Sequence, residues 1–365
     1  MTTLYAVPTI ADDDAPTVRR TPRRIRKFTA EDRFAAIGSL LASFALVYVG
    51  YLHILYFSGL LGFLVCWYLV YLVVYGVVVS VTNPRPIVVE RLVTSTLYLA
   101  SAVVVLALGS TVFYTFAKGW RAIVHLNFFT HDMAGVSPTA PLTQGGIFHA
   151  IVGTVIEVGI AVAVSVPLGI GTAVYMTEVR GRGSKLVRTI VESMTALPEI
   201  LAGLFVYVVL VIGFGLSKTG LAVSAAMAVT MVPIIARAGE VALRVVPGGL
   251  REASSALGAT HWKTVTRVVL PSAAAGLVTA TILAIARGIG ETAIPLICSG
   301  ASSFTNYNPV QEPMNSLPLL AYTEYSTHEP LAIIRAFGAA SVLLTMVLIL
   351  FVAARLVVRE RRSRR

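Results

Sequence analysis

The chain has 365 residues, of which 56% are hydrophobic and only 13% are charged, and its mean hydropathy is +0.80. Soluble domains carry about 25% charged residues, so this composition excludes a soluble globular protein and predicts a polytopic, all-α membrane protein. The net charge of +11 would suit a nucleic-acid partner, but the basic residues gather beside apolar segments. That placement is typical of a membrane-topology signal, and we infer no nucleic-acid binding.

A membrane span needs about 20 apolar residues, and the hydropathy pattern predicts eight of them. A polar, basic tail over residues 1–33 precedes an additional transmembrane hairpin within 34–85, whose spans lie at about 34–57 and 59–81. A core over residues 86–358 follows, and a basic tail over 359–365 ends the chain. The six core spans are expected at about 92–116, 147–176, 189–214, 221–243, 271–299 and 331–356.

Eight spans place both termini on the same side of the membrane. The N-terminal tail is rich in arginine, and six arginines occur from Arg355 to the end of the chain. Basic residues also fill the connections after the second, fourth and sixth spans, whereas the opposite face carries only Lys118, Arg121 and Lys218. Positive residues favour the cytoplasmic side, so both termini are predicted to lie in the cytoplasm, with the protein in the cytoplasmic membrane.

The segment from Arg251 to Ala293 is the most informative part of the sequence. Its first half is polar and helix-prone, and its second half is an apolar span interrupted by Arg287 and Glu291. A charge within a span costs roughly 2.5–3.5 kcal/mol on insertion scales, so it normally faces a partner, a cavity or a path. The two residues are four apart, so we expect them to share a helix face and neutralise each other.

Two motifs in this segment resemble those of a known family. Glu252-Ala253-Ser254, Gly258 and Val268-x-Leu270-Pro271 resemble the cytoplasmic EAA loop of ABC-importer permeases, with Ser254 replacing Ala and Val268 replacing Ile. Ala286-Arg287-Gly288-Ile289-Gly290-Glu291-Thr292-Ala293 resembles the narrower motif of phosphate-specific permeases. The resemblance covers about residues 92–356 and implies a six-helix ABC-importer permease core, to which the N-terminal hairpin is an addition.

The resemblance also implies how the protein works. The loop at 249–271 would be a short helix over 249–262 that docks on a cytoplasmic ABC ATPase dimer, through Glu252, Ala253, Gly258, Leu270 and Pro271. A second, homologous permease and an extracytoplasmic phosphate-binding protein would complete the importer, and the loops near 117–146 and 300–330 would meet the binding protein. Arg287 and Glu291 would line the substrate path, because a guanidinium fork matches phosphate oxygens with parallel hydrogen bonds.

Other polar groups give weaker signals. Glu157 and Glu199 lie within predicted spans, where we expect either a pair with Arg335 or hydrogen bonds between helices. Pro167, Pro198 and Pro295 are expected to kink their helices. Glu199 departs from the family pattern, which has a small polar residue after the proline. No phosphate-binding loop of the G-x-x-x-x-G-K-[ST] type is present. The six histidines and two cysteines show no metal-ligand spacing, so we expect no metal, no cofactor and no catalytic activity in this chain.

Three alternatives remain open on sequence alone. The substrate of such an importer could be another oxyanion, such as sulfate or molybdate. The intramembrane carboxylates also suit an ion-coupled secondary carrier, which would transport without an ATPase. A transport-linked sensor would bind the same partners without flux.

Overall fold

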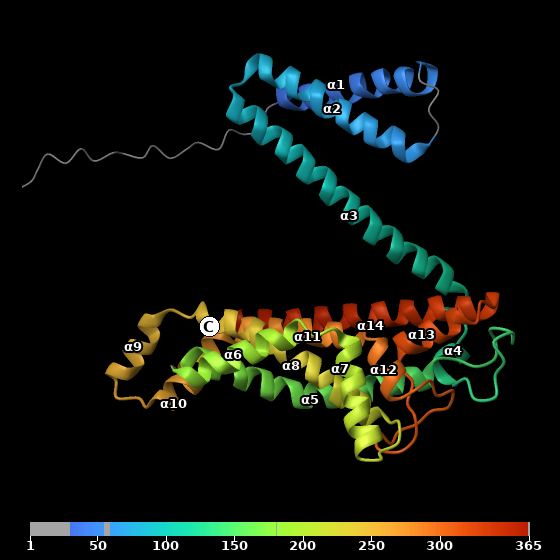
Figure 1. Cartoon of the computed structure of the whole chain (residues 1–365), viewed down its shortest axis with the longest axis vertical. Coiled ribbons are helices and arrows are strands. Elements are labelled where there is room, and N and C mark those ends of the chain that lie inside the picture. The colour runs from blue at the N-terminus through green and yellow to red at the C-terminus, as the bar shows by residue number, and fades with distance from the viewer. Residues whose placement is uncertain (1–29, 55–58, 180, 364–365) are drawn as a thin grey trace, which may run out of the picture. The chain divides into compact units, whose positions relative to one another are not determined.

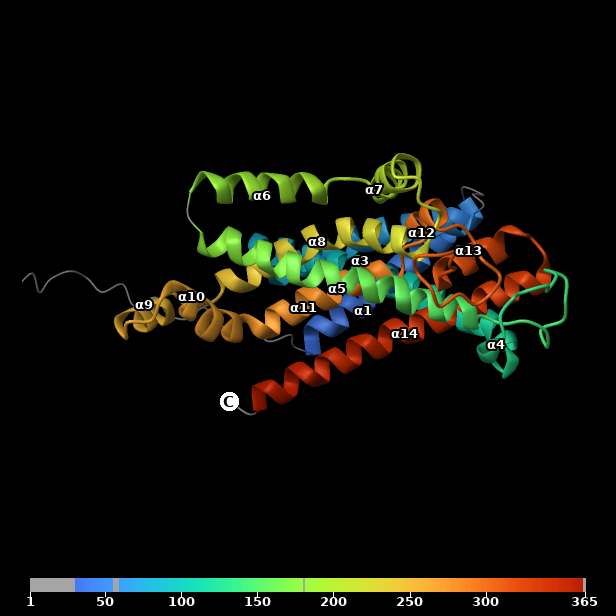
Figure 2. The same ribbon diagram turned by 90° about the horizontal axis from the view of Figure 1, so that it is seen from below.

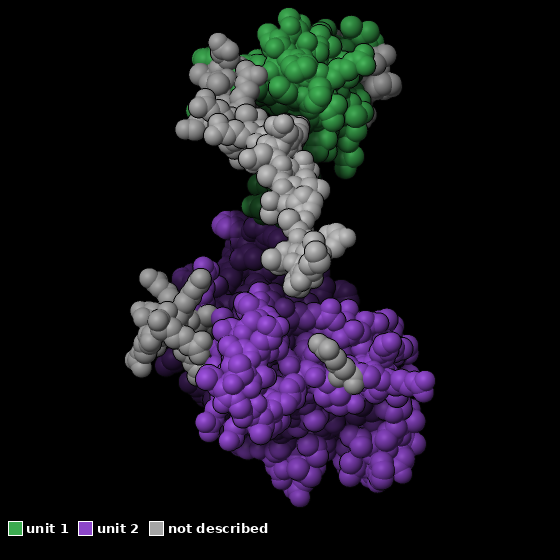
Figure 3. Space-filling model, turned by 90° about the vertical axis from the view of Figure 1, so that its left-hand side faces the viewer, with its two compact units in different colours: residues 1–106 green, residues 107–365 purple. Residues whose placement is uncertain are grey.

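The computed structural model describes residues 30–54, 59–179 and 181–363, and these form helices joined by turns and loops, with no β-strand among them. The predicted all-α class is confirmed. The chain divides into two compact units, Met1–Leu106 and Ala107–Arg365 (Figure 3). Most of the predicted N-terminal tail lies outside the described residues.

The first unit contains a helical hairpin. Helix α1 (Ala30–Tyr48), which continues as a π-helical segment to Ile54, packs against α2 (Leu60–Thr82). Phe44 meets Trp67 edge to face, with ring centroids 5.2 Å apart, which is a favoured geometry for aromatic pairs. Helix α3 (Arg85–Ile123) begins after the break at Asn83-Pro84, and an ion pair of 2.6 Å between Arg91 and Asp32 ties its first part to α1.

In the second unit, four long helices lie alongside one another: α5 (Phe148–Glu178), α8 (Gly220–Arg244), α11 (Leu270–Ile289) and α14 (Pro330–Ser363) (Figures 1 and 2). Glycines bring α5 and α8 close together, since a Cβ on Gly169 would lie 2.6 Å from that of Ile235. Small residues at the contact are how membrane helices gain packing without a hydrophobic driving force.

The two ends of this bundle carry different elements. Helices α9 (Gly248–Ala256) and α10 (His261–Thr264) lie at one end, and α4 (Asn127–Thr130) and α13 (Leu317–Ser326) lie toward the other (Figure 2). The loop after α4 and the loop before α13 are joined, because the backbone N–H of Met133 donates to the carbonyl oxygen of Ser303 at 2.9 Å. The EAA-like segment and the two long loops therefore lie at opposite ends, as the sequence predicts.

The predicted fifth span, 189–214, is not one helix. Helix α6 (Arg182–Thr195) and α7 (Glu199–Val206), which continues as a π-helical segment to Gly213, meet at a bend of 103°. Pro198 lacks a backbone N–H and disfavours helical geometry in the preceding residue, so the helix ends before it. Among the described residues, seven helices are long and apolar enough to cross a membrane, or eight if this bent pair counts as one span. A multi-pass membrane protein is thus confirmed.

The predicted seventh span, 271–299, is also interrupted. Helix α11 ends at Ile289, and the short helix α12 (Ala293–Cys298) follows after three residues. Gly288 and Gly290 weaken the helix at this point, since glycine costs about 1 kcal/mol relative to alanine in a helix. On its N-terminal side, α11 is continuous with a π-helical turn at Val265–Val269 and with α10. Together they form one helical segment, His261–Ile289.

Candidate functional site

The EAA-like segment folds as two short helices with a sharp turn between them. The predicted helix over 249–262 stops at Ala256, and Gly258 follows with a φ of 76°. Its N–H donates to the carbonyl oxygen of Ser255 at 2.9 Å, and the N–H of Ala259 donates to that of Ser254 at 3.2 Å. A left-handed residue at this place is the common way to end a helix, and glycine adopts it without strain.

The outer face of this segment is open. Glu252, Ala253 and Gly258 are exposed, whereas Leu270 and Pro271 are half-buried in the helix beyond. Two bulky apolar side chains flank the turn, Leu257 with 89% of its surface exposed and Trp262 with 72%. These two side chains are therefore candidates for an interface. Neither side chain is among the residues predicted from the sequence, although both lie close to Gly258 in the chain.

The segment is nevertheless firmly attached to the bundle. The guanidinium of Arg251 pairs with the carboxylate of Glu178 at the end of α5, with N–O distances of 2.9 and 3.2 Å. It also donates to the carbonyl oxygens of Leu243 and Val246, at 3.3 and 2.9 Å, where α8 ends. The hydroxyls of Ser254 and Thr264 are hydrogen-bonded at 2.9 Å, which joins α9 to the start of the continuous helix.

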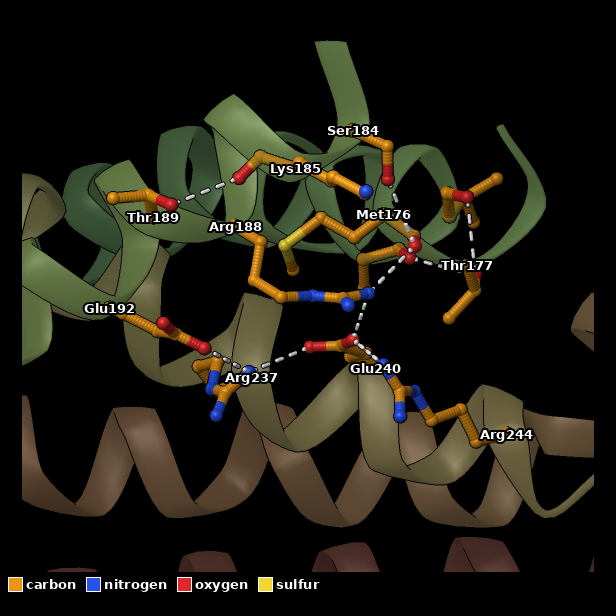
Figure 4. A network of polar contacts seen from close by, with 12 residues as sticks. Met176, Thr177, Ser184, Lys185, Arg188, Thr189, Glu192, Arg237, Glu240 and Arg244 are labelled. Carbon is orange, nitrogen blue, oxygen red and sulfur yellow. Dashed lines mark hydrogen bonds and ion pairs between the residues drawn. The ribbon is translucent and has the colours of Figure 1, made fainter. Parts of the chain in front are cut away.

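A second polar cluster, the Glu240 cluster, lies where α5, α6 and α8 meet. The carboxylate of Glu240 is 3% exposed and pairs with Arg188 at 2.6 Å, Arg237 at 3.0 Å and Arg244 at 2.6 Å (Figure 4). Arg188 also donates to the carbonyl oxygen of Met176 at 3.1 Å, near the end of α5. Arg188 therefore holds α6 against α8 through the buried Glu240 carboxylate, and against α5 through the Met176 carbonyl oxygen.

Within the membrane-spanning part, Arg287 has a different partner from the predicted one. The predicted pairing with Glu291 is wrong, because α11 ends at Ile289 and the two residues no longer share a helix face. Instead, two nitrogens of the Arg287 guanidinium contact one carboxylate oxygen of Glu199, and the Nε–Oε1 distance is 2.6 Å. The Glu291 carboxylate accepts from the N–H of Ala293 at 3.0 Å and interacts with that of Glu199.

This ion pair connects the two interrupted helices. Glu199 is the first residue of α7, directly after Pro198, and Arg287 lies in the last turn of α11. The side chains are 58% exposed for Arg287 and 30% for Glu199. A charge within a membrane span normally faces a partner, a cavity or a path, so this partly exposed pair is a candidate site.

The expected partner of Glu157 and Glu199, Arg335, is engaged elsewhere. Its guanidinium donates to four loop carbonyl oxygens, those of Pro138, Ala140, Pro141 and Gln144, at 2.7–3.4 Å. The alternative in which either glutamate pairs with Arg335 is therefore wrong, whereas the other alternative, a hydrogen bond between helices, is confirmed for Glu199 by its contact with Arg287. Glu157 is fully buried in α5, and its carboxyl has no hydrogen-bond partner among the described residues.

Asp132 also fixes this loop. It accepts from the N–H and the hydroxyl of Thr305, at 3.0 and 3.1 Å, and from the N–H of Ala134 at 3.2 Å. Partial burial acts to raise the pKa of the Asp132 carboxyl, but these hydrogen bonds to the charged form outweigh burial and hold the pKa below its ordinary value.

Comparison with known proteins identifies the family. The family described as "Binding-protein-dependent transport system inner membrane component" matches residues 165–364, more than half of the chain. "Phosphate transport system permease protein PstA 1" of Mycobacterium tuberculosis (strain ATCC 25618 / H37Rv) is 38% identical over 271 residues, covering 74% of this chain and 87% of that protein. "Probable ABC transporter permease protein YqgI" of Bacillus subtilis (strain 168) is 30% identical over 234 residues, covering 62% and 78%.

Among solved structures, an inward-facing MetNI methionine ABC transporter aligns with a TM-score of 0.47 at 24% identity, covering 59% of this chain and 94% of that one. The matched family region contains α6 to α12, and hence the EAA-like segment, the Glu240 cluster and both residues of the Arg287–Glu199 pair. The chain belongs to the family of inner-membrane components of binding-protein-dependent transport systems.

Proposed function

We propose that this chain is a permease subunit of an ATP-driven importer for inorganic phosphate. The observation that carries the proposal is the 38% identity to a phosphate transport permease over 74% of this chain. ATP hydrolysis belongs to a separate cytoplasmic ATPase dimer. A second, homologous permease and an extracytoplasmic phosphate-binding protein complete the assembly.

Arg287 is the substrate-contacting residue in this proposal. A guanidinium stays protonated at any physiological pH and offers parallel N–H groups that suit phosphate oxygens. Arg287 lies just before the break that ends α11, and it pairs with Glu199, which directly follows the break at Pro198. Its side chain is more than half exposed in the single chain, which is consistent with a position on an aqueous path. Glu291 interacts with the Glu199 carboxylate that pairs with Arg287.

The segment from α9 to α10 is the site of force transfer. Leu257 and Trp262 would fill a groove on the ATPase, and Glu252 would pair with basic groups there. Movement of α9 passes to α10 through Ser254 and Thr264, and from there along one continuous helix to Arg287. Alternating access follows if ATP-driven closure tilts this helix and opens the path outward.

The α9 end of the bundle is cytoplasmic in this proposal, with both chain termini on that side. The excess of arginine and lysine around α6, α9 and the end of α14 supports this orientation. The loops that Arg335 and Asp132 hold in place then face outward and form the docking surface for the binding protein.

The test is uptake of labelled inorganic phosphate at low external concentration in cells that lack the chain. Wild type should restore uptake, and Arg287→Ala and Glu291→Gln should not, although both insert in the membrane. Arg355→Ala, which removes an exposed arginine at the end of α14, is the matched control and should restore uptake.

Competition distinguishes the other substrates and mechanisms. Excess sulfate or molybdate should leave uptake unchanged, and uptake should fail without the ATPase partner. Restoration by Arg287→Ala would remove this residue from the path. Competition by sulfate would replace the substrate, and uptake driven by membrane potential alone would indicate a secondary carrier.

A further inference from the structure

The Arg287–Glu199 pair has a geometry that bears directly on substrate release. Two guanidinium nitrogens contact a single oxygen of Glu199, so the carboxylate occupies the edge of the guanidinium that would receive a phosphate oxygen. Glu199 does this from another helix, 88 residues away in sequence. In the described structure, the Nε–Nη2 edge of the Arg287 guanidinium is therefore filled by the protein's own anion.

The pair is built so that it can be exchanged. Its two side chains are partly exposed, and ion pairs that water can reach are weak, at about 0–1 kcal/mol. The Glu291 side chain also interacts with the Glu199 carboxylate. The Glu199 carboxylate is therefore shared between the Arg287 guanidinium and the Glu291 side chain, and it is not held by Arg287 alone.

The backbone around the pair permits separation. Glu199 directly follows the break at Pro198, and Arg287 precedes the break at Gly290. A change in the 103° bend between α6 and α7 would move the Glu199 carboxylate relative to α11 without distorting either helix internally. Few loop residues need to change their dihedral angles in such a hinge.

We propose that Glu199 is a tethered competitor for Arg287, which occupies the guanidinium before phosphate arrives and displaces phosphate afterwards. This inference rests on the proposed function, since it assumes that Arg287 contacts the transported anion. Glu199 then sets how long phosphate stays, and it excludes monovalent anions such as chloride, which form weaker contacts with the fork than a carboxylate does.

Direct binding provides the first test. The full-length chain is purified in lipid nanodiscs, and binding of labelled inorganic phosphate is measured for wild type, Glu199→Gln and Glu192→Gln. The amide in Glu199→Gln keeps the shape but not the charge, so phosphate should bind up to about fivefold more tightly, equivalent to about 1 kcal/mol. Glu192→Gln is the matched control, since Glu192 lies seven residues earlier and pairs with the exposed Arg237; it should leave binding unchanged.

Chemical labelling gives a second measurement on the same samples. Phenylglyoxal reacts with free guanidinium groups, and mass spectrometry of the Arg287 peptide reports the reaction at that site alone. Labelling of Arg287 should rise in Glu199→Gln and fall again when inorganic phosphate is added. Glu199→Ser, which removes the carboxylate with a small side chain, should behave in the same way and covers the case in which Glu199→Gln does not fold.

The transport assay tests the role of Glu199 as a competitor separately from the proposed function of the chain. In cells, Glu199→Gln should lower both the KM for phosphate and the maximal rate, because phosphate binds more tightly and leaves more slowly, and chloride should begin to inhibit. A folded Glu199→Gln and Glu199→Ser with unchanged or weaker phosphate binding would overturn the tethered competitor and leave the proposed function standing. Equal phosphate binding and uptake in wild type and Arg287→Ala would overturn the role of Arg287, and the inference with it.

Discussion

Replacing Glu240 by glutamine tests whether the Glu240 cluster is the joint that holds α6 on the bundle. The glutamate side chain is 3% exposed and pairs with three arginines, two of them at 2.6 Å. Removing one partner of a buried ion pair costs about 3–5 kcal/mol, because the remaining charge stays buried without compensation. Here the arginines are themselves 32%, 44% and 58% exposed, so water recovers part of that loss.

We therefore expect Glu240→Gln to lower the free energy of unfolding by about 2–3 kcal/mol. Since each kcal/mol shifts the melting temperature of a domain of this size by about 2–4 °C, the expected decrease is about 4–12 °C. The buried thiol of Cys298 provides the assay, because a thiol-reactive dye reports its exposure on heating in a background in which Cys66 is replaced by serine.

Glu192→Gln is the control for this experiment. Glu192 also pairs with Arg237, at 3.2 Å, but its side chain is 50% exposed, so its removal should cost less than about 1 kcal/mol. Equal melting temperatures for the two variants would refute the reasoning, since burial would then not decide the strength of these pairs. Replacing Glu240 and Arg188 together by methionine should recover part of the stability, because it removes the uncompensated charge as well.

Three further predictions concern other contacts. Gly153→Ala should lower stability by about 1–3 kcal/mol, because its Cβ would overlap the carbonyl oxygen of Asn315, whereas Gly159→Ala in the same helix meets nothing within 4 Å and should not; thermal unfolding of the two variants compares them. Arg251→Met should reduce phosphate uptake without reducing membrane insertion, since it releases α9 from α5, and wild-type uptake at equal expression would contradict that role. The hydrogen bonds to the Asp132 carboxylate stabilise the loop fully at a pH above the ordinary pKa of aspartate, about 4. This stabilisation is lost as the pH falls through the lowered pKa of Asp132 in the folded state. Protease cleavage of this loop should therefore increase at acidic pH in wild type. In Asp132→Asn, the same increase in cleavage should already occur at neutral pH.

Much of the architecture could be predicted from local sequence. Long apolar runs decide where helices cross the membrane, and a change from apolar to polar residues marks their ends, so seven of the eight predicted spans correspond to long apolar helices. The turn at Gly258 was also predictable, because the need for a residue with positive φ is a local property. In both cases, the physical cause lies within a few residues of the feature.

The charged contacts could not be predicted in this way. The assumption that Arg287 and Glu291 share a helix face failed because a hydropathy average does not register a helix break at Gly290. Glu199 could not be assigned to Arg287, because the two are far apart in sequence and only the fold brings them together. The Glu240 cluster did leave a local signal, since Arg237 and Arg244 lie one turn before and one turn after the glutamate.

The contacts together suggest why α6 and α7 form a bent pair and not a straight span. Arg188 fixes α6 to the Glu240 carboxylate on α8, and Glu199 fixes the start of α7 to Arg287 on α11. Between these two attachments lies the break at Pro198, which has no helical hydrogen bond to lose when its angle changes. A tilt of α11 therefore has two outcomes: the bend at Pro198 changes or the Arg287–Glu199 pair opens. A straight helix would resist a change of angle, whereas the break at Pro198 permits one, so a small tilt of α11 changes only the bend. A larger tilt opens the Arg287–Glu199 pair, because one partly exposed ion pair is weak.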